Sequence, residues 1–514
     1  MAFGPRPARV GLVCVAPVPW SPGRQAEAGG TVAVPVSPVT RLLTRTMKFG
    51  NAPTGGGSCA TLCASGAERR AQHGPCDRGG LAVTVAAIGN TGNAAQLFRG
   101  TNHSPSYFML NRAGVAGGGQ DIVDFCIPCN PYFPTPGMFD ELSAMLRDIL
   151  TYYPSSADTI TAELAHLLDL QPQTMAMGNG STELITWIDH LLVKDSLAVP
   201  IPTFGRWTDQ PDETGKRVDM FRLPERHGFA LDPDAFVSFI RQRGSRTAVI
   251  CNPNNPDGGL LSRDAVISFM DSLADLDLVV IDESFLEFVD PDSGPWPSVV
   301  DEAVVRPNVV VLRSLGKNFG LHGVRFGYLV ANPSLARKVR SRLPKWNLNS
   351  FAEIIVFMLK DHQQDYEMSL RMLARDRQEM ISQLGCLPGM TVYPSQGNFV
   401  FVKLPEGADG VQVRDRLLSE HGVLVRECGN KLGSSSQFMR LVVRSEPDVQ
   451  RLLSGLSSVL YGSAWYAPLP GGQQLQAAAY APSPGMRLTA PGAGMPGAGA
   501  GLPGPGPGSG RRRR

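Results

Sequence analysis

The segment Leu276–Asp282 constrains the fold of this chain more than any other, because it is almost continuously apolar up to its closing acid. A strand with apolar residues on both sides of its pleat has to be covered on both faces, as the central strands of parallel sheets are. Comparable runs recur along the middle of the chain, separated by stretches of helical periodicity, so the sequence predicts an α/β fold with a largely parallel sheet. The other predicted strands are Leu197–Ile201, Thr247–Cys251, Val309–Arg313 and Phe326–Val330.

The pattern changes after residue 350. Phe351–Leu384 has the periodicity of long helices, whereas Gly397–Leu404 and Phe438–Val443 have the composition of strands. These segments predict a smaller α+β domain, and a chain of 514 residues is long enough for two domains.

Both ends of the chain differ from the middle. Residues 1–100 contain nine arginines and one lysine but only three acids, without sustained periodicity, and we expect residues 1–104 to be a low-complexity extension. A transit peptide, a disordered segment and a wrongly chosen start codon all explain it, so the location is expected to be cytoplasmic or organellar. From Trp465 onward, 12 Gly and 9 Pro among 50 residues predict a disordered tail over residues 463–514.

Composition excludes several classes of function. The formal net charge is +2 and no basic stripe alternates with aromatic residues, so we expect no nucleic-acid partner. No run of eighteen apolar residues predicts a membrane span. The nine cysteines include one CxxC, Cys126 and Cys129, without a second pair to complete a zinc site, so we expect no metal and a reducing compartment.

Four loops rich in Gly, Pro or polar residues could lie at the carboxyl ends of strands, where α/β proteins bind ligands. They are Gly178–Glu183, Asn252–Gly258, Asp282–Phe285 and Arg313–Tyr328. The glycines of the first precede the helical run Leu184–Val193 and would let the backbone approach an anion at a helix N-terminus. An ordinary helix start capped by Ser181 or Thr182 is the alternative.

Each of the other loops also has two interpretations. Asn252–Gly258 is either simply a rigid turn or a turn that holds an amide against a ligand. Asp282, directly after an apolar strand, needs a cationic partner, although a helix cap or a salt bridge would also serve. Lys317 lies in a Gly-rich loop after a buried strand. Shielding from water would lower the pKa of Lys317 and free its amine for Schiff-base chemistry. The alternative is an ordinary lysine on the surface.

The motifs GNGSTE, NPNNPDG, DESF and SLGKxFGLxGxRxGY, in this order, resemble those of the fold-type I, class I/II aminotransferase superfamily over roughly residues 120–462. The intervals of 27 residues from Asn255 to Asp282 and 35 from Asp282 to Lys317 match as well. The branch most similar is that of histidinol-phosphate aminotransferase and threonine-phosphate decarboxylase. The resemblance implies pyridoxal-5′-phosphate (PLP) as cofactor, a mostly parallel seven-stranded sheet between helices in a large domain, and a homodimer. It divides the chain into an arm with part of the small domain (105–165), the large domain (166–345) and the small C-terminal domain (346–462).

The resemblance also implies a role for individual residues. Lys317 would form the Schiff base and move the Cα proton, Asp282 would keep the pyridine nitrogen protonated, and Asn255 would bind the ring 3′-oxygen. Phe204 would stack on the ring, and Tyr153 would reach the cofactor phosphate from the partner subunit. The cofactor phosphate would be bound by Gly180, Ser181, Thr182, Ser314 and Arg325. The substrate would be bound by Arg440, through its α-carboxylate, and by Arg426 and Asn130.

Three residues depart from the family pattern. Phe285 stands where aminotransferases of this group usually have Tyr, so one hydroxyl that tunes the cofactor is missing. The phosphothreonine decarboxylase branch tolerates Phe at this position. Gly316 replaces a Ser or Thr and loses one hydrogen bond to phosphate. Asp257 replaces a Thr, and we expect it to be a turn acid.

Three functions remain open. An aminotransferase that moves an amino group between an amino acid and a 2-oxo acid is the leading hypothesis. A decarboxylase of an amino acid or of a phosphorylated amino acid would use the same Lys317 and Asp282 but break the Cα–carboxylate bond. A non-catalytic module of the same fold is the third, although residues 1–100 offer no helix-turn-helix pattern for a regulator.

Overall fold

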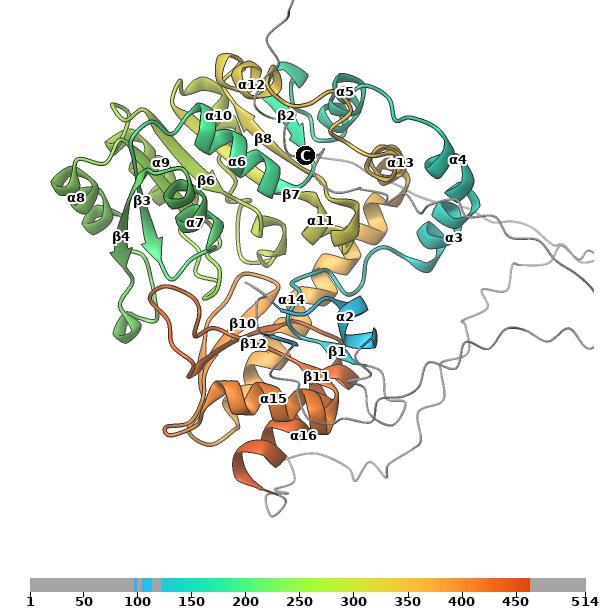
Figure 1. Cartoon of the computed structure of the whole chain (residues 1–514), viewed down its shortest axis with the longest axis vertical. Coiled ribbons are helices and arrows are strands. Elements are labelled where there is room, and N and C mark those ends of the chain that lie inside the picture. Colours follow the sequence, from blue (N-terminus) through green and yellow to red (C-terminus); the bar gives the residue numbers. More distant parts are fainter. Residues whose placement is uncertain (1–96, 99–103, 113–121, 463–514) are drawn as a thin grey trace, which may run out of the picture. The chain divides into compact units, whose positions relative to one another are not determined.

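The computed structural model describes residues 97–98, 104–112 and 122–462 (Figure 1). All of them belong to one compact unit, Val85–Arg514. The predictions made for residues 1–104 and 463–514 lie outside the described residues, apart from residues 97, 98 and 104.

A seven-stranded sheet forms the large domain, with strands in the order β2-β8-β7-β6-β5-β3-β4. All neighbouring strands are parallel except β8, which runs antiparallel to both β2 and β7, so the predicted α/β fold with a mostly parallel sheet is confirmed. The strands are β2 (Met175–Gly178), β3 (Ser196–Ile201), β4 (Arg217–Arg222), β5 (Thr247–Cys251), β6 (Leu278–Asp282), β7 (Val309–Ser314) and β8 (Gly327–Ala331).

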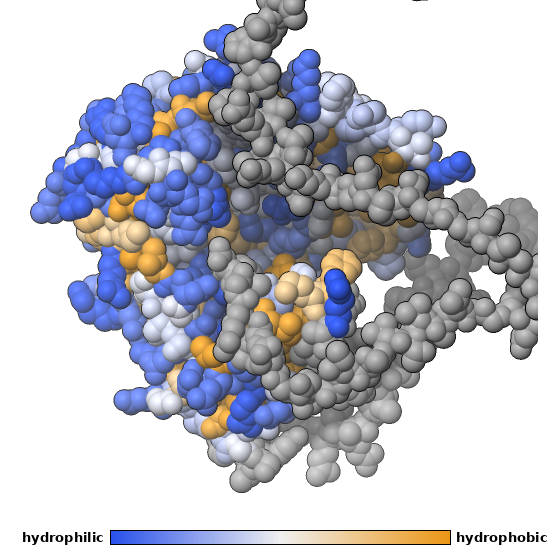
Figure 2. Space-filling model, in the orientation of Figure 1, coloured by the Kyte–Doolittle hydropathy of each residue, from blue (hydrophilic) through white to orange (hydrophobic). Residues whose placement is uncertain are grey.

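Helices cover both faces of this sheet, as the apolar β6 requires. Within β6, Val280 packs in one cluster with side chains of α6, α7 and α12, whereas Val279 and Ile281 pack in another with α8, α9 and α10. Each such buried side chain contributes roughly 1.5–3 kcal/mol. The surface over α8 is hydrophilic on the face seen in Figure 2, which fits a helix that buries one stripe. The helices are α6 (Ser181–Leu191), α7 (Arg206–Glu213), α8 (Pro233–Arg243), α9 (Arg263–Ser272), α10 (Val300–Val305) and α12 (Pro333–Arg340).

The smaller α+β domain has its own core, built from an antiparallel sheet, a parallel pair of short strands and three helices. The sheet has the order β12-β13-β10-β9, and β10 and β13 confirm the two strands predicted there. The strands are β1 (Val123–Asp124), β9 (Thr391–Tyr393), β10 (Phe399–Lys403), β11 (Val423–Leu424), β12 (Arg426–Glu427) and β13 (Phe438–Val442). The helices are α14 (Gln363–Gly385), α15 (Gly410–His421) and α16 (Glu446–Tyr461).

Further helices surround these two cores, and no helix among the described residues is both long and apolar enough to cross a membrane. The predicted helical region 351–384 is confirmed as α13 and α14, joined by a short 3-10 turn. The remaining α-helices are α2 (Tyr107–Arg112), α3 (Pro136–Ala144), α4 (Leu146–Thr151), α5 (Ala157–Leu167), α11 (Leu315–Asn318) and α13 (Ser350–Met358). The short 3-10 helices are η2 (Pro172–Thr174), η3 (Glu225–His227), η4 (Leu286–Phe288), η5 (His322–Val324) and η6 (Leu359–His362).

Candidate active site

Three of the predicted loops meet because the strands before them are neighbours. β5, β6 and β7 lie side by side and parallel, so the residues that follow them gather at one edge of the sheet. Two backbone hydrogen bonds hold the ends of these strands together. Asn252 N donates to Asp282 O (2.9 Å), and Glu283 N donates to Leu312 O of β7 (2.9 Å). Asn255, Asp282 and Lys317 are therefore brought to the same edge.

Lys317 lies in the short helix α11, and its Nζ is 4.8 Å from the ring centroid of Phe285 and 5.8 Å from that of Phe204. Burial lowers the pKa of Lys317 to about 8, although Asp282 acts in the opposite direction. A larger fraction of the amine is thus unprotonated near neutral pH than for a lysine in water. An unprotonated amine between two aromatic rings is suited to attack an aldehyde.

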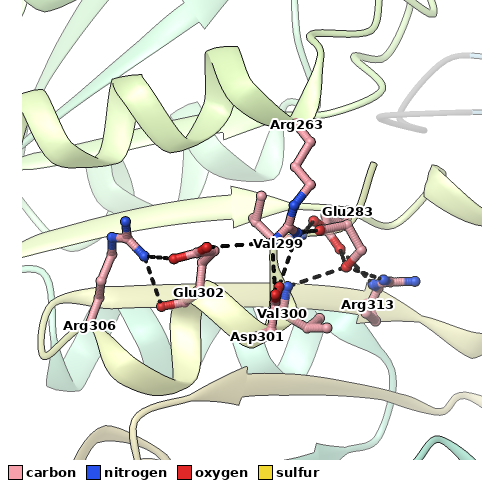
Figure 3. A network of polar contacts seen from close by, with 9 residues as sticks. Arg263, Glu283, Val299, Val300, Asp301, Glu302, Arg306 and Arg313 are labelled. Atoms are coloured by element: carbon pink, nitrogen blue, oxygen red, sulfur yellow. Dashed lines mark hydrogen bonds and ion pairs between the residues drawn. The ribbon is translucent and has the colours of Figure 1, made fainter. Parts of the chain in front are cut away.

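The two acids after β6 have different partners. Asp282 Oδ2 accepts a hydrogen bond from Trp207 Nε1 (2.8 Å), and its Oδ1 accepts one from Ser284 N (3.1 Å). Glu283 instead forms a buried ion pair with Arg313 (2.9 Å), within the polar network drawn in Figure 3. Burial raises the pKa of Glu283, and Arg313 opposes that shift. Glu283 is therefore occupied in holding β6 and β7 together, and Asp282 is the acid left for a ligand.

An anion cradle lies at the N-terminus of α6. Its N-cap is Gly180, with φ of 79° and no side-chain cap, so the alternative in which Ser181 or Thr182 caps the helix is wrong. A Cβ at Gly180 would lie 2.5 Å from Arg325 Nη2, so only glycine lets the arginine approach the helix start. Ser181 and Ser314 are both buried. The helix N-terminus and the guanidinium together suit a phosphate.

A second group of cations comes from the small domain. Arg440 is 2% exposed and donates from Nη1 to Asn255 Oδ1 (2.9 Å) and from Nη2 to Cys126 O (2.7 Å). Arg426 lies directly opposite Arg440 in the β12–β13 pair and donates to Asn430 Oδ1 (2.7 Å). Facing like charges repel each other, so an anion bound between or beside them would stabilise this pair.

Lys431, which the sequence reasoning missed, completes this group. Its Nζ donates to Thr203 O (2.8 Å), and burial lowers its pKa to about 8. A cavity of about 230 Å³ lies against it and is lined by Phe204, Asn255, Arg426, Lys431 and Arg440, among others. The signal in the sequence was weak: one of only nine lysines, in a Gly-rich stretch five residues after Arg426.

Comparison with known proteins identifies the arrangement. The family model described as aminotransferase class I and II matches residues 121–456. The chain belongs to this family. An L-serine phosphate decarboxylase of Sulfurospirillum multivorans is 30% identical over 355 residues, which cover 66% of this chain and 89% of that protein. A histidinol-phosphate aminotransferase of Thermoanaerobacter sp. strain X514 is 32% identical over 312 residues, 60% of this chain and 84% of that protein.

Solved structures agree with this membership of the aminotransferase class I and II family. The structure of a decarboxylase from Sulfurospirillum multivorans is 29% identical in sequence and superimposes with a TM-score of 0.64. The match covers 70% of this chain and 93% of the decarboxylase chain. In the sequence comparison, another relative is 31% identical to this chain, and the match covers 58% of that relative's length. The chain is thus an enzyme of the PLP-dependent class I/II family, and the predicted cofactor, PLP, is confirmed.

The residues present fit this cofactor. The aldehyde, the phosphate and the ring nitrogen of PLP each meet a suited group, in the amine of Lys317, the cradle at Gly180 and Arg325, and the carboxylate of Asp282. Asn255 accepts from Arg440 through Oδ1, which leaves its NH2 group to donate to a ring oxygen. Asp257 is a turn acid as expected, since its Oδ1 accepts from Gly259 N (2.8 Å), and burial raises its pKa to about 6.

Two predicted site residues are not joined to this arrangement through their side chains. Tyr153 is 85% exposed and its ring packs against Trp346, with 5.6 Å between centroids. The side chain of Asn130 bonds Ser369 Oγ (2.8 Å) and Tyr132 N (3.0 Å), and its backbone N donates to Lys317 O (3.2 Å). The roles of these two residues and of the other predicted site residues toward cofactor and substrate stay predictions, as do the domain boundaries.

Proposed function

We propose that this enzyme decarboxylates an O-phosphorylated L-α-amino acid with PLP, as the name of its Sulfurospirillum relative describes for that protein. The observation that carries the proposal is the cation group of the small domain. Arg426, Lys431 and Arg440 line one cavity beside Phe204 and Asn255. A substrate that carries both a carboxylate and a phosphate would neutralise this group.

The charges in the cavity match such a substrate. Burial is the main cause of the lowered pKa of Lys431, and the neighbouring Arg440 and Arg426 also lower it. A bound dianion would reverse that effect and favour the charged lysine. Asp209 also lines the cavity, and a bound dianion would add negative charge beside Arg426, Lys431 and Arg440.

When bound, PLP supplies an electron sink for the electron pair left on the substrate Cα. Asp282 would hold a proton on the ring nitrogen and so sustain that sink. Lys317, with a pKa of about 8, can release and accept a proton near neutral pH, so its Nζ would return a proton to Cα after carbon dioxide leaves. Phe204 and Phe285 flank Nζ and would limit the access of water.

Phe285 supports decarboxylation over transamination. Its ring is 4.8 Å from Lys317 Nζ and packs edge-on against Phe399 (5.0 Å between centroids), so this side of the amine has no hydroxyl. Transamination needs the Cα proton to be taken up and delivered to a second carbon, whereas decarboxylation needs one proton delivered to Cα. A less polar surrounding of Lys317 suits the simpler proton transfer.

Transamination is the second candidate, because the chain is 32% identical to a histidinol-phosphate aminotransferase. The same cations would bind a phosphorylated amine. The test is a screen of O-phospho-L-serine, O-phospho-L-threonine and L-histidinol phosphate plus 2-oxoglutarate, with Lys317→Ala as the blank. Carbon dioxide release with the cofactor unchanged supports the proposal. Conversion of the cofactor to its amine form, with glutamate made from 2-oxoglutarate, supports the second candidate instead.

We also propose that the enzyme is a homodimer. The segment from α3 to Tyr153 carries exposed apolar side chains, a composition typical of an interface. They are Phe139, Met145, Leu146, Leu150, Tyr152 and Tyr153. Sedimentation of the wild type and of Leu150→Glu tests the proposal: a dimer is expected for the first and a monomer for the second, and a monomeric wild type contradicts it.

A further inference from the structure

Asp282 has a partner that no motif pointed to. Trp207 Nε1 donates to Asp282 Oδ2 at 2.8 Å, while Cys251 Sγ lies 3.9 Å from the same oxygen. Trp207 is 1% exposed and packs in the apolar cluster between α6 and the sheet, and Asp282 is 3% exposed. The bond is therefore shielded from water, where a hydrogen bond to a charged group has its largest effect.

The location of Trp207 couples it to the rest of the site. It follows Phe204 by three residues, and its backbone N donates to Phe204 O (3.0 Å), so one turn at the start of α7 holds both rings. Phe204 lines the cavity and faces Lys317 Nζ, and Trp207 holds the acid after β6. The same turn thus sets the positions of a ring and a carboxylate relative to each other.

The indole N–H has a property that other donors lack. It donates without being able to accept, so its one possible hydrogen bond to Asp282 runs from Nε1 to the carboxylate. A histidine or a carboxylic acid in its place could also accept a hydrogen bond, and the orientation of the carboxylate would be less defined.

We propose that Trp207 is a positioning residue for Asp282: its indole N–H fixes the orientation of the carboxylate toward the ring nitrogen of PLP. The inference rests on the cofactor and not on the reaction, so it holds equally for a decarboxylase and for an aminotransferase. PLP affinity is measured without substrate, so a failure of the proposed role of Trp207 can be told apart from a failure of the proposed decarboxylation.

The experiment compares PLP affinity in three proteins from which the cofactor has been removed: wild type, Trp207→Phe and Trp187→Phe. Trp187 packs on the same apolar cluster, and no hydrogen bond joins it to Asp282 within the described part of the chain, so its variant controls for lost aromatic packing. We expect Trp207→Phe to bind PLP about ten-fold more weakly than the wild type. Trp187→Phe should stay within two-fold of the wild type.

A third variant separates a role in positioning from one in packing. Benzothienylalanine at position 207 keeps the shape of the side chain and replaces the N–H by sulfur, so this variant should bind PLP as weakly as Trp207→Phe although the packing is kept. Equal affinities for Trp207→Phe and Trp187→Phe overturn the proposal. Wild-type affinity with benzothienylalanine at position 207 overturns it as well, also where Trp207→Phe does not fold.

Discussion

The two halves of the active site are built in different ways. On the cofactor side, Asn255, Asp282 and Lys317 follow three neighbouring parallel strands, β5, β6 and β7. On the substrate side, Arg426 and Arg440 come from paired strands of the small domain, more than a hundred residues further along the chain than Lys317. The first half is held by the sheet itself, whereas the second requires the small domain to be folded against the large one.

This difference predicts how each half responds to mutation. A residue on the cofactor side should affect all turnover, because PLP carries every reaction of the family. A residue on the substrate side should affect KM for one class of substrate and leave PLP affinity unchanged.

The largest effect is expected for Lys317→Ala, which removes the amine that reacts with the cofactor. Turnover should fall by at least about a thousand-fold, and borohydride reduction should no longer attach the cofactor to position 317, as mass spectrometry would detect. Lys338→Ala, at an exposed lysine of α12, is the matched control and should leave both unchanged. A reducible adduct that persists in Lys317→Ala would show that another amine is the nucleophile.

The second prediction separates the adjacent acids. Asp282→Asn should lower kcat by about a hundred-fold or more with little loss of stability, because the charge of Asp282 would serve the ring nitrogen of PLP rather than an ion pair like that of Glu283. Glu283→Gln should lower the free energy of unfolding by about 3 kcal/mol, because it leaves Arg313 only partly paired, while PLP still binds. Urea unfolding and PLP titration measure the two effects. The reverse pattern would contradict the assignment of roles.

On the substrate side, Lys431→Met should raise KM for a phosphorylated amino acid by about ten-fold or more and leave PLP affinity within two-fold of wild type. Inorganic phosphate should inhibit the wild type competitively and the variant only weakly. Lys403→Met, at a lysine paired with Glu225 outside the cavity, is the control. Unchanged kinetics in Lys431→Met would remove this residue from the substrate site.

The smallest effect concerns stability and pH. The pKa of Lys431 is about 8 in the folded chain, below its value of 10.5 in water, so above pH 8 the unfolded chain binds more protons at this residue than the folded one. Its contribution to stability should therefore increase as the pH rises from 8 to 9, by roughly 1 kcal/mol. The rise should be steeper in the wild type without PLP than in Lys431→Met, which keeps the contribution of Lys317, whose pKa is also about 8. Equal pH slopes of the unfolding free energy in the two proteins would contradict a lowered pKa.

The sequence could predict the sheet and the cofactor side because both depend on local patterns. Continuous apolar runs mark the strands that are covered on both faces, and the acid or glycine after each run marks the edge where a ligand binds. The strands that escaped detection had no such pattern. β2 (Met175–Gly178) is short and lacks β-branched residues, and in the edge strand β4 (Arg217–Arg222) three of the six residues are charged and three are exposed.

Only the tertiary structure decided which side chains meet across the chain. Nothing in the local sequence pairs Trp207 with Asp282, places Lys431 beside Thr203, or sets Arg426 opposite Arg440. Such contacts join residues far apart in sequence, and their energies depend on burial and on the distance between charges, which exist only after the domains have packed. The sequence alone thus indicated the family, the fold and the lysine that we expect to react with PLP, whereas packing determined how Asp282 is held and which cations line the cavity where we propose that a substrate binds.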